Sequence, residues 1–599
     1  MCRIFGYLSK KTISKNILHK VSLRQINGGP DEQGLIEQKE WALGNNRLAI
    51  QGISGGHQPF YLSGIYCVFN GEIYNHNQLR KTLLTKGYAF SDECDGSIIP
   101  ALYLEYGLDF VKKLDGMFAI AVIDTRHSEK NKLFIFSDPV GIKSVYFTYN
   151  NNEKAFSFAS EIQALTEFKL SPNEIRIDAI EEYLSGRAIW GSNTIYNDIK
   201  QLEPSKILSF DVHNGISIST YESDIDAEIE SRTLDEAGFE LHNIIEEEVK
   251  QMLSADVPAC VVTSGGLDSS YITAIASKFS PGIHSFNVAY AGKWPFDERE
   301  YAQKVAKQYN TQHHQIEIQE NEFPDYLEKM LNHIGQPNTA PHCISTYALF
   351  SEVRKQGFKL AITGEGADEM FGGYKRFANA TFDDAPNWMD NYLDSLSSVN
   401  QATRLASYSE RYKKILVEKG FHDLYCKNIL TELQKKHSKL DALLHFDQDY
   451  RFPYYILRRV DHLSMANSVE VRVPFCQLKI RSLARKLPIE YKLDKTNVKK
   501  ILYSAAKGKL DDSILNRPKQ PFTLPIAAML KEGHPLMNIA ENALFSEKFK
   551  NRNIFNHAYV KRLFNSQMSK PNNIAAETIW SLTTMELWMQ MNKCDFRVE

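Results

Sequence analysis

The first two hundred residues contain short runs rich in β-branched and aromatic side chains, each closed by Asn, Asp or Gly. Such runs are typical of β-strands, and two segments with helical spacing interrupt them, at 77–85 and 97–106. The pattern predicts an α+β arrangement dominated by antiparallel strands. The strands are expected at 65–69, 118–123, 132–136, 145–149 and 155–159.

A polar, acidic stretch at 222–235 is the expected boundary between this part and a second pattern. Beyond it, apolar strands alternate with helices, which predicts a parallel sheet covered on both faces, an α/β arrangement. The strands are expected at 259–263, 283–289, 313–318 and 359–363, and the helices at 269–277 and 298–309. After about residue 390 the pattern is mostly helical. We therefore expect two domains, at 2–210 and 225–599.

Length and charge narrow the class of protein. At 599 residues the chain exceeds what one core usually serves. Its 70 basic and 73 acidic residues give a net charge of −3, which argues against a nucleic-acid-binding surface. No apolar run approaches the roughly 20 residues that span a bilayer, and the N-terminus does not read as a signal peptide. We therefore expect a soluble, cytoplasmic protein without membrane or nucleic-acid partners.

A glycine-rich loop follows the first strand of the second part and reads S-G-G-L-D-S-S at 264–270. Glycines allow a sharp turn close to a ligand, and the free N–H groups of the following helix favour phosphate. Asp268 could hold Mg²⁺ against such phosphates. The loop lacks the G-K-[ST] ending of a Walker A motif. A plain strand–helix turn is the alternative. The candidate nucleotide-binding residues are Ser264, Gly265, Gly266, Asp268 and Ser269.

A second loop, T-G-E-G-A-D-E at 363–369, follows another buried strand and should open at the same sheet edge. Its three carboxylates repel one another unless a cation or base contact compensates. A solvated acidic turn is the alternative. The loop contributes Gly364, Glu365 and Asp368 as candidate site residues.

The first loop resembles the pyrophosphate-binding PP-loop, and 364–374 resembles the G-E-G-x-D-E-x-F-G-G-Y signature of asparagine synthetases. The resemblance implies a doubly wound sheet that binds ATP and cleaves it to AMP and pyrophosphate. It also implies Mg²⁺ binding by Asp268 and Asp368, and a role for Glu365 in deprotonating the incoming amine. The segment N-R-P-K-Q-P-F at 516–522 resembles the family's R-x-K segment, and Lys519 would stabilise negative charge on phosphate and acyl oxygens.

Cys2 becomes the first residue once Met1 is removed, and its own α-amine can then accept the thiol proton. The segment N-G-E-I-Y-N at 70–75 resembles class II, or N-terminal nucleophile (Ntn), glutamine amidotransferases, which implies an αββα sandwich. In that family the matching residues form an oxyanion hole (Asn70, Gly71) and bind glutamine (Arg47, Asn70, Glu72, Asp95). Two positions depart from the family pattern. G-G-P-D stands at 28–31 where R-G-P-D is common, and Ser97 replaces a common glutamate.

Together the motifs resemble glutamine-hydrolysing asparagine synthetases over nearly the whole chain. The resemblance implies amidation of L-aspartate through an acyl-adenylate, with glutamine, ATP and Mg²⁺, and a homodimer is compatible with it. The acceptor stays open, because Thr339 matches a substrate threonine whereas His342 stands where an arginine is expected, so a sugar uronic acid or natural-product carboxylate is the alternative. A non-catalytic glutamine or nucleotide sensor and an ATP-dependent cyclase are the competing classes.

Overall fold

The structure is a computed structural model. It describes residues 2–126, 131–221, 232–294, 297–517, 524–594 and 596–598.

The N-terminal part consists of two six-stranded sheets in which neighbouring strands are antiparallel. The first has the order β10-β8-β9-β1-β3-β2 and the second β12-β11-β7-β6-β5-β4. The strands are β1 Cys2–Ser9, β2 Glu32–Glu37, β3 Trp41–Arg47, β4 Phe60–Leu62, β5 Ile65–Ile73, β6 Gly116–Asp124, β7 Lys132–Ser137, β8 Tyr146–Asn150, β9 Ala155–Ala159, β10 Ile199–Gln201, β11 Lys206–Asp211 and β12 Gly215–Thr220. All five strands expected from the sequence are present, and β12 extends the sandwich past residue 210.

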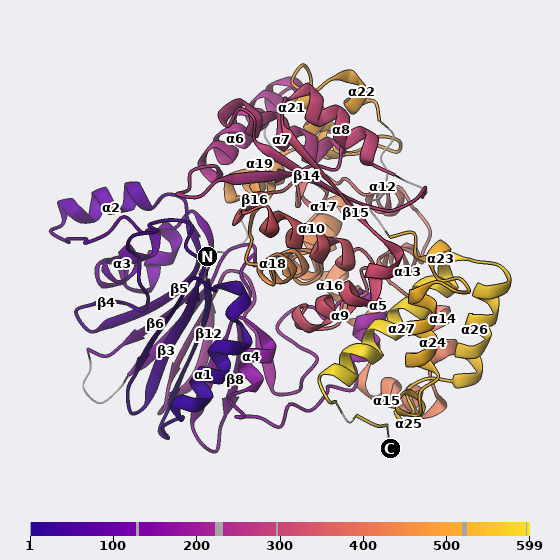
Figure 1. Ribbon diagram of the computed structural model, residues 1–599, viewed down its shortest axis with the longest axis horizontal. Coiled ribbons are helices and arrows are strands. Elements are labelled where there is room, and N and C mark those ends of the chain that lie inside the picture. Colours follow the sequence, from indigo (N-terminus) through magenta and orange to yellow (C-terminus); the bar gives the residue numbers. More distant parts are fainter. Residues whose placement is uncertain are drawn as a thin grey trace.

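The two sheets pack face to face, because each presents an apolar face to the other. Ile4, Leu43 and Phe158 of the first sheet share a core with Val68 and Ile135 of the second. Helices cover the outer faces: α1 Lys15–Arg24 and α4 Ile162–Thr166 on the first sheet, and α2 His76–Thr85 and α3 Ile99–Tyr106 on the second. This part lies at the lower left of Figure 1, in indigo and purple.

The second part contains a five-stranded parallel sheet of order β15-β14-β13-β16-β17. Its strands are β13 Ala259–Val262, β14 His284–Tyr290, β15 Gln312–Ile318, β16 Leu360–Ile362 and β17 Glu470–Arg472, and its early helices are α6 Leu234–Met252, α7 Leu267–Phe279, α8 Arg299–Gln308 and α10 Cys343–Lys355. The four strands and two helices expected from the sequence are confirmed. The strand order reverses between β13 and β16, and ligands of such sheets bind at this reversal.

The remainder is mostly helical: α18 Arg458–Met465 packs on α10 near the centre of Figure 1, and the last helices form a group at the lower right, in yellow. One hydrophobic core runs from the outer face of the first antiparallel sheet into these helices. A helix of the first half takes part in it: α5 Ala179–Gly186 places Tyr183 against α27 Asn573–Met591, where its hydroxyl donates to the Ser581 carbonyl at 2.9 Å. Among the described residues, no helix combines the length and apolar character that crossing a membrane requires.

The expected boundary stretch at 222–235 lies only partly within the described residues, since 222–231 fall outside them. Its C-terminal end belongs to α6, because Thr233 caps that helix and forms a capping box with Glu236. The acidic stretch therefore ends as the first turn of a helix.

Candidate functional site

Cys2 begins β1 and is buried, with 3% of its surface exposed. Its main-chain N donates to Asn70 Oδ1 at 3.2 Å, and Gln58 Nε2 lies 3.2 Å from its sulfur. Burial raises the pKa of the Cys2 thiol, which Arg47 partly opposes. The Asn70 side-chain Nδ2 is buried and has no hydrogen-bond partner among the residues that the structure describes. An unsatisfied buried donor next to a cysteine is suited to receive a developing negative charge.

Only glycine fits at position 71, because of its backbone conformation and the closeness of the neighbouring strand. Its φ is +153°, and a side chain would place Cβ 2.0 Å from the Met117 carbonyl oxygen of the paired strand β6. Because β5 continues through Ile73, Asn70 and Gly71 lie within its last four residues.

The residues expected to bind glutamine surround Cys2. Arg47 pairs with Cys2 across β1 and β3, and it contacts Glu32 Oε2 at 3.1 Å and the Gly52 carbonyl at 2.8 Å. Asp95 is buried, and its Oδ2 accepts from the Ile73 N–H at 2.9 Å. Cys2 at the start of β1, Arg47 at the end of β3 and Asn70 near the end of β5 therefore lie together, and Asp95 contacts the last residue of β5.

Gly52 and Ile53, which follow Arg47 in the chain, are hydrogen-bonded to the second half. Asp256, in the loop before β13, accepts hydrogen bonds from the Gly52 N–H at 2.8 Å and the Ile53 N–H at 3.3 Å. Gly52 in turn offers its carbonyl to Arg47. Asp31 connects the halves too, since its Oδ2 binds the Ala49 N–H and Lys359 Nζ.

Arg472, at the end of β17, contacts both halves. Its guanidinium forms ion pairs with Glu470 at 2.6 Å and with Glu72 of the first half at 2.9 Å, while its main-chain oxygen accepts from the Thr363 N–H that opens the acidic loop. Burial raises the pKa of Glu72 to about 8, and Arg472 opposes this rise while Asp95 and Glu470 add to it. The resemblance implies that Glu72 binds glutamine, and in the structure its carboxylate pairs with Arg472 of the second half.

The glycine-rich loop closes on itself after β13. Gly265 has φ +75°, and a side chain there would meet Tyr301 Cβ at 2.5 Å, so only glycine fits. The Ser264 and Ser269 hydroxyls are 2.9 Å apart, and the Ser264 N–H donates to Ser269 Oγ at 3.0 Å. Gly266 caps α7, which leaves main-chain N–H groups at the helix start for an anion.

Asp268 and Asp368 meet on one cation, the ammonium of Lys499. Lys499 Nζ is 2.7 Å from Asp268 Oδ1 and 2.9 Å from Asp368 Oδ1. Although burial favours the neutral amine, the two carboxylates raise the pKa of Lys499. Its backbone is left-handed, with φ +52°, a conformation that non-glycine residues adopt at a cost and often at functional sites. Lys499 is not among the site residues predicted from the sequence.

The other carboxylates of the acidic loop do not share this site. Glu369 lies in the short helix α11 Ala367–Phe371, is buried, and accepts from the Tyr374 hydroxyl at 2.5 Å. Glu365 Oε2 is buried and has no hydrogen-bond partner within the described ranges. Burial, followed by Asp447 and Asp368, raises the pKa of Glu369 to about 7, so the expected repulsion acts within this turn. The Lys499 ammonium compensates the charge of Asp368.

The other predicted site residues fall near or outside this centre. Lys519 lies outside the described residues. Arg517, from the same segment, binds Glu298 at 2.8 Å and stacks on the Tyr301 ring beside the glycine-rich loop. Thr339 is buried, and its Oγ1 has no hydrogen-bond partner in the part of the chain that the structure describes. His342 contacts Arg459, and burial followed by that guanidinium lowers its pKa.

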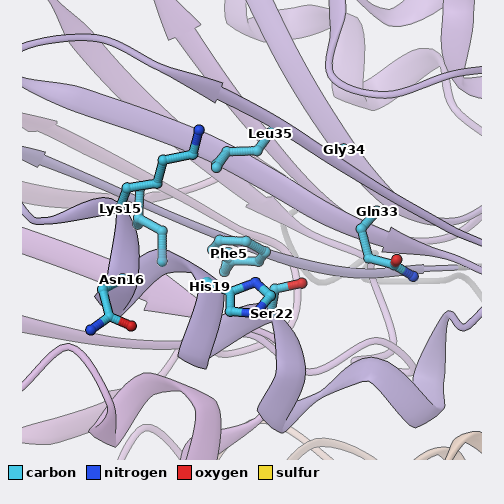
Figure 2. A pocket seen from close by; sticks show the side chains of 9 residues that line it. Phe5, Lys15, Asn16, His19, Ser22, Gln33, Gly34 and Leu35 are labelled. Atoms are coloured by element: carbon cyan, nitrogen blue, oxygen red, sulfur yellow. The ribbon is translucent and has the colours of Figure 1, made fainter.

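A cavity of about 450 Å³ lies apart from this site, between α1 and β2 (Figure 2). Phe5 lines it, and side chains of β1 alternate between faces, so this cavity and the Cys2 side chain are on opposite faces of the sheet. None of the residues predicted for the site is among its lining residues, which are Phe5, Lys15, Asn16, Leu18, His19, Ser22, Gln33, Gly34 and Leu35.

Comparison with known proteins agrees with the geometry. The asparagine synthase family pattern matches residues 240–590, and the glutamine amidotransferase domain pattern matches residues 1–222. The chain therefore belongs to the asparagine synthase family, whose members are ligases, and it carries an amidotransferase domain.

Several curated relatives align over much of their length. Asparagine synthetase [glutamine-hydrolyzing] 1 of Bacillus subtilis (strain 168) is 28% identical, covering 99% of this chain and 97% of the relative. Asparagine synthetase [glutamine-hydrolyzing] 3 of the same organism is 29% identical over 87% of each. Asparagine synthetase B [glutamine-hydrolyzing] of Escherichia coli (strain K12) is 32% identical over 63% of this chain and 66% of the relative.

Proposed function

We propose that the protein transfers the amide nitrogen of glutamine to L-aspartate, using ATP to form an acyl-adenylate and releasing L-asparagine, glutamate, AMP and pyrophosphate. One observation carries the proposal. A single chain holds a buried cysteine beside an unsatisfied amide donor and two paired carboxylates at the reversal of a parallel sheet, and Arg472 contacts both regions. The names and coverage of the relatives support the same reaction.

The first half acts as an Ntn-type glutaminase with the αββα layering of that fold, over residues 2–210 extended by β12. After removal of Met1, the Cys2 α-amine accepts the thiol proton and the sulfur attacks the glutamine amide carbon. The C–N bond then breaks, ammonia leaves, and water hydrolyses the glutamyl thioester. Asn70 Nδ2 and the Gly71 N–H stabilise the oxyanion. Arg47 binds the glutamine α-carboxylate, Asp95 binds its α-amino group, and Glu72 supports this loop through Arg472.

The second half, residues 225–599, acts as a doubly wound PP-loop synthetase. The loop Ser264–Ser269 and Gly364 bind ATP phosphates through main-chain N–H groups. The acceptor carboxylate attacks the α-phosphorus and pyrophosphate leaves. Ammonia then attacks the acyl carbon, Glu365 takes a proton from it, and AMP leaves. The Lys499 ammonium stabilises charge on phosphate and acyl oxygens, and Lys519 has the same role in this proposal.

Asp268 and Asp368 fit a magnesium ion. Mg²⁺ typically binds one or two carboxylates together with substrate phosphates, and these two carboxylates converge beside the phosphate-binding loop. When bound, the ion supplies charge neutralisation of the phosphates. Lys499 supplies positive charge to the same carboxylates.

A different carboxylic acid is the second candidate for the acceptor, because segment 336–342 contains no arginine. Arg459 lies against His342 and offers a guanidinium from α18 instead. Such a displaced cation suits an acid whose carboxylate lies at a different distance from the reacting group, such as a sugar uronic acid. Aspartate remains the first choice because the relatives that align over most of their length are named asparagine synthetases, and asparagine is the amide of aspartate.

The test combines an acceptor panel with a nucleophile variant. Purified protein receives glutamine, Mg·ATP and either aspartate or another acid, while pyrophosphate and amide products are measured. We expect asparagine with glutamine or ammonium for the wild type, and with ammonium only for Cys2→Ala. Product from another acid alone would replace aspartate. Unchanged glutamine-dependent synthesis by Cys2→Ala would exclude a glutaminase, and pyrophosphate release without added nitrogen would indicate a cyclase. A protein that shows no glutamine hydrolysis and no ATP cleavage would be a sensor instead of an enzyme.

We also propose a cytoplasmic homodimer, in keeping with the resemblance to asparagine synthetases. Cell fractionation and light scattering of the purified chain test these two points. A monomer at micromolar concentration would refute the dimer without affecting the proposed reaction.

A further inference from the structure

Arg3 occupies the space that a side chain at position 28 would need. A Cβ built on Gly28 would lie 2.6 Å from Arg3 Cγ, 2.7 Å from Nε and 3.0 Å from Cδ. Position 28 is where the motif of the resembling family carries an arginine and this chain carries glycine. Gly28 does not have a positive φ, so Arg3 rather than the backbone prevents a side chain there.

The Arg3 guanidinium connects the two halves of the protein. Arg3 is fully buried, and it binds Glu161 at 2.9 Å within the first half and Asp461 of α18 at 2.8 Å in the second. Lys143 Nζ binds the other oxygen of Asp461 at 2.6 Å. Although burial alone would raise it, Lys143 and Arg3 hold the pKa of Asp461 well below its usual range. A buried carboxylate held by two cations from the other half strongly constrains the junction.

Arg3 also follows the nucleophile directly. Successive side chains of a strand point to opposite faces, so Cys2 faces the sandwich interior while Arg3 faces α18. Helix α18 leads into β17, whose Arg472 binds Glu72 in the N-G-E-I-Y-N segment. The segment from α18 to β17 therefore contacts the glutaminase site at two places: Asp461 binds Arg3 of β1, and Arg472 binds Glu72.

We propose that Arg3 is a positioning residue that couples the two reactions, and that an arginine at position 28, where the R-G-P-D motif carries one, would take over its contacts with the second half. The inference rests on the proposed function. Arg3 keeps the strand carrying Cys2 seated on α18, so that ammonia released at one site is used at the other. Because positions 3 and 28 share one space, the arginine should be movable between them.

The experiment exchanges the arginine between the two positions in the full-length chain. Arg3→Ala, Gly28→Arg and the double variant Arg3→Ala/Gly28→Arg are compared with the wild type. Arg24→Ala, an exposed arginine of α1, is the matched control. The readout is the amount of amide product formed per glutamine hydrolysed. Glutamine hydrolysis alone, ammonium-dependent synthesis and thermal melting are recorded for every variant.

We expect product per glutamine to fall about tenfold in each single variant, the order seen for contacting residues, and to recover at least half of its wild-type value in the double variant. Arg24→Ala should match the wild type. A double variant no better than the worse single variant would overturn the proposal, as would full coupling in Arg3→Ala. If the single variants do not fold, recovery of melting temperature and coupling by the double variant still decides the question. A wild type that makes no amide product would instead refute the proposed function.

Discussion

The glutamine site should depend on Asp256, a residue of the other half of the protein. Asp256 accepts from the main-chain N–H groups of Gly52 and Ile53, and the Gly52 carbonyl accepts from Arg47. Asp256→Ala removes this acceptor but keeps the hydrogen bond from the main-chain N–H of residue 256 to the Ile50 carbonyl, so Gly52 and Ile53 are held less firmly beside Arg47. Arg47 is proposed to hold the glutamine α-carboxylate, so the change should weaken binding of glutamine without altering the attacking sulfur.

The magnitude follows from the exposure of Asp256. A hydrogen bond to a charged group contributes about 1.5–3 kcal/mol, and a typical one about 0.5–1.5 kcal/mol. Because Asp256 is exposed, the lower range applies. The KM for glutamine should therefore rise roughly 2- to 10-fold while kcat stays within about twofold, the pattern of lost uniform binding.

Glutamate release without ATP measures this change directly. Asp256→Asn retains a carbonyl oxygen as acceptor and should have the smaller effect. Ammonium-dependent synthesis by Asp256→Ala should equal that of the wild type, which shows that the synthetase half is intact. An unchanged KM in Asp256→Ala, or a fall in kcat at constant KM, would refute the reasoning that the loop is held through Gly52.

Three further changes test other contacts. Lys499→Met should lower pyrophosphate release at least about 100-fold while glutamine hydrolysis persists; normal release would remove Lys499 from the reaction. Asn70→Ala should lower kcat for glutamine hydrolysis about 10²- to 10³-fold, measured as glutamate release, and leave ammonium-dependent synthesis unchanged; a change in KM alone would assign Asn70 to binding. Burial, reinforced by Asp115, raises the pKa of Glu248 to about 7 against the attraction of Lys479, so the folded state binds its proton more tightly than the unfolded state. The free energy of unfolding should therefore fall by up to about 3 kcal/mol as pH rises from about 4.5 to about 7. The melting temperature of the wild type should drop more than that of Glu248→Gln over this range. Equal drops would contradict the raised pKa of Glu248.

The sequence predicted strands well where β-branched and aromatic residues cluster. Strand β9 has the expected bounds, and β5 and β6 extend the expected ranges by a few residues. Strand β3, with the sequence W-A-L-G-N-N-R, was not among those predicted, although it pairs with both β1 and β2. Glycine and asparagine disfavour strands, so pairing with its neighbours rather than local preference determines its conformation.

The same distinction applies to the site. The approach of Asp268 and Asp368 could be predicted, because both loops follow adjacent parallel strands. Lys499 could not, since it stands 231 residues from Asp268 in a left-handed turn and its neighbour is another lysine. A lysine pair in a polar stretch is usually solvated, and only the packing of the α21 segment, Lys500–Ala506, places this one between the carboxylates. The Glu72–Arg472 contact is equally non-local.

The continuous hydrophobic core has a consequence for attempts to divide the protein. Helix α5 belongs to the first half by sequence, yet Tyr183 is sealed against α27, and Arg187 donates to the carbonyls of Leu396 and Ser397. Expressing the two halves as separate fragments would remove α5 from its contacts with the C-terminal helices and expose apolar surface on both fragments. The two halves therefore do not behave as separable modules, because they share one hydrophobic core. Point variants in the intact chain are therefore the means of silencing one reaction while keeping the other.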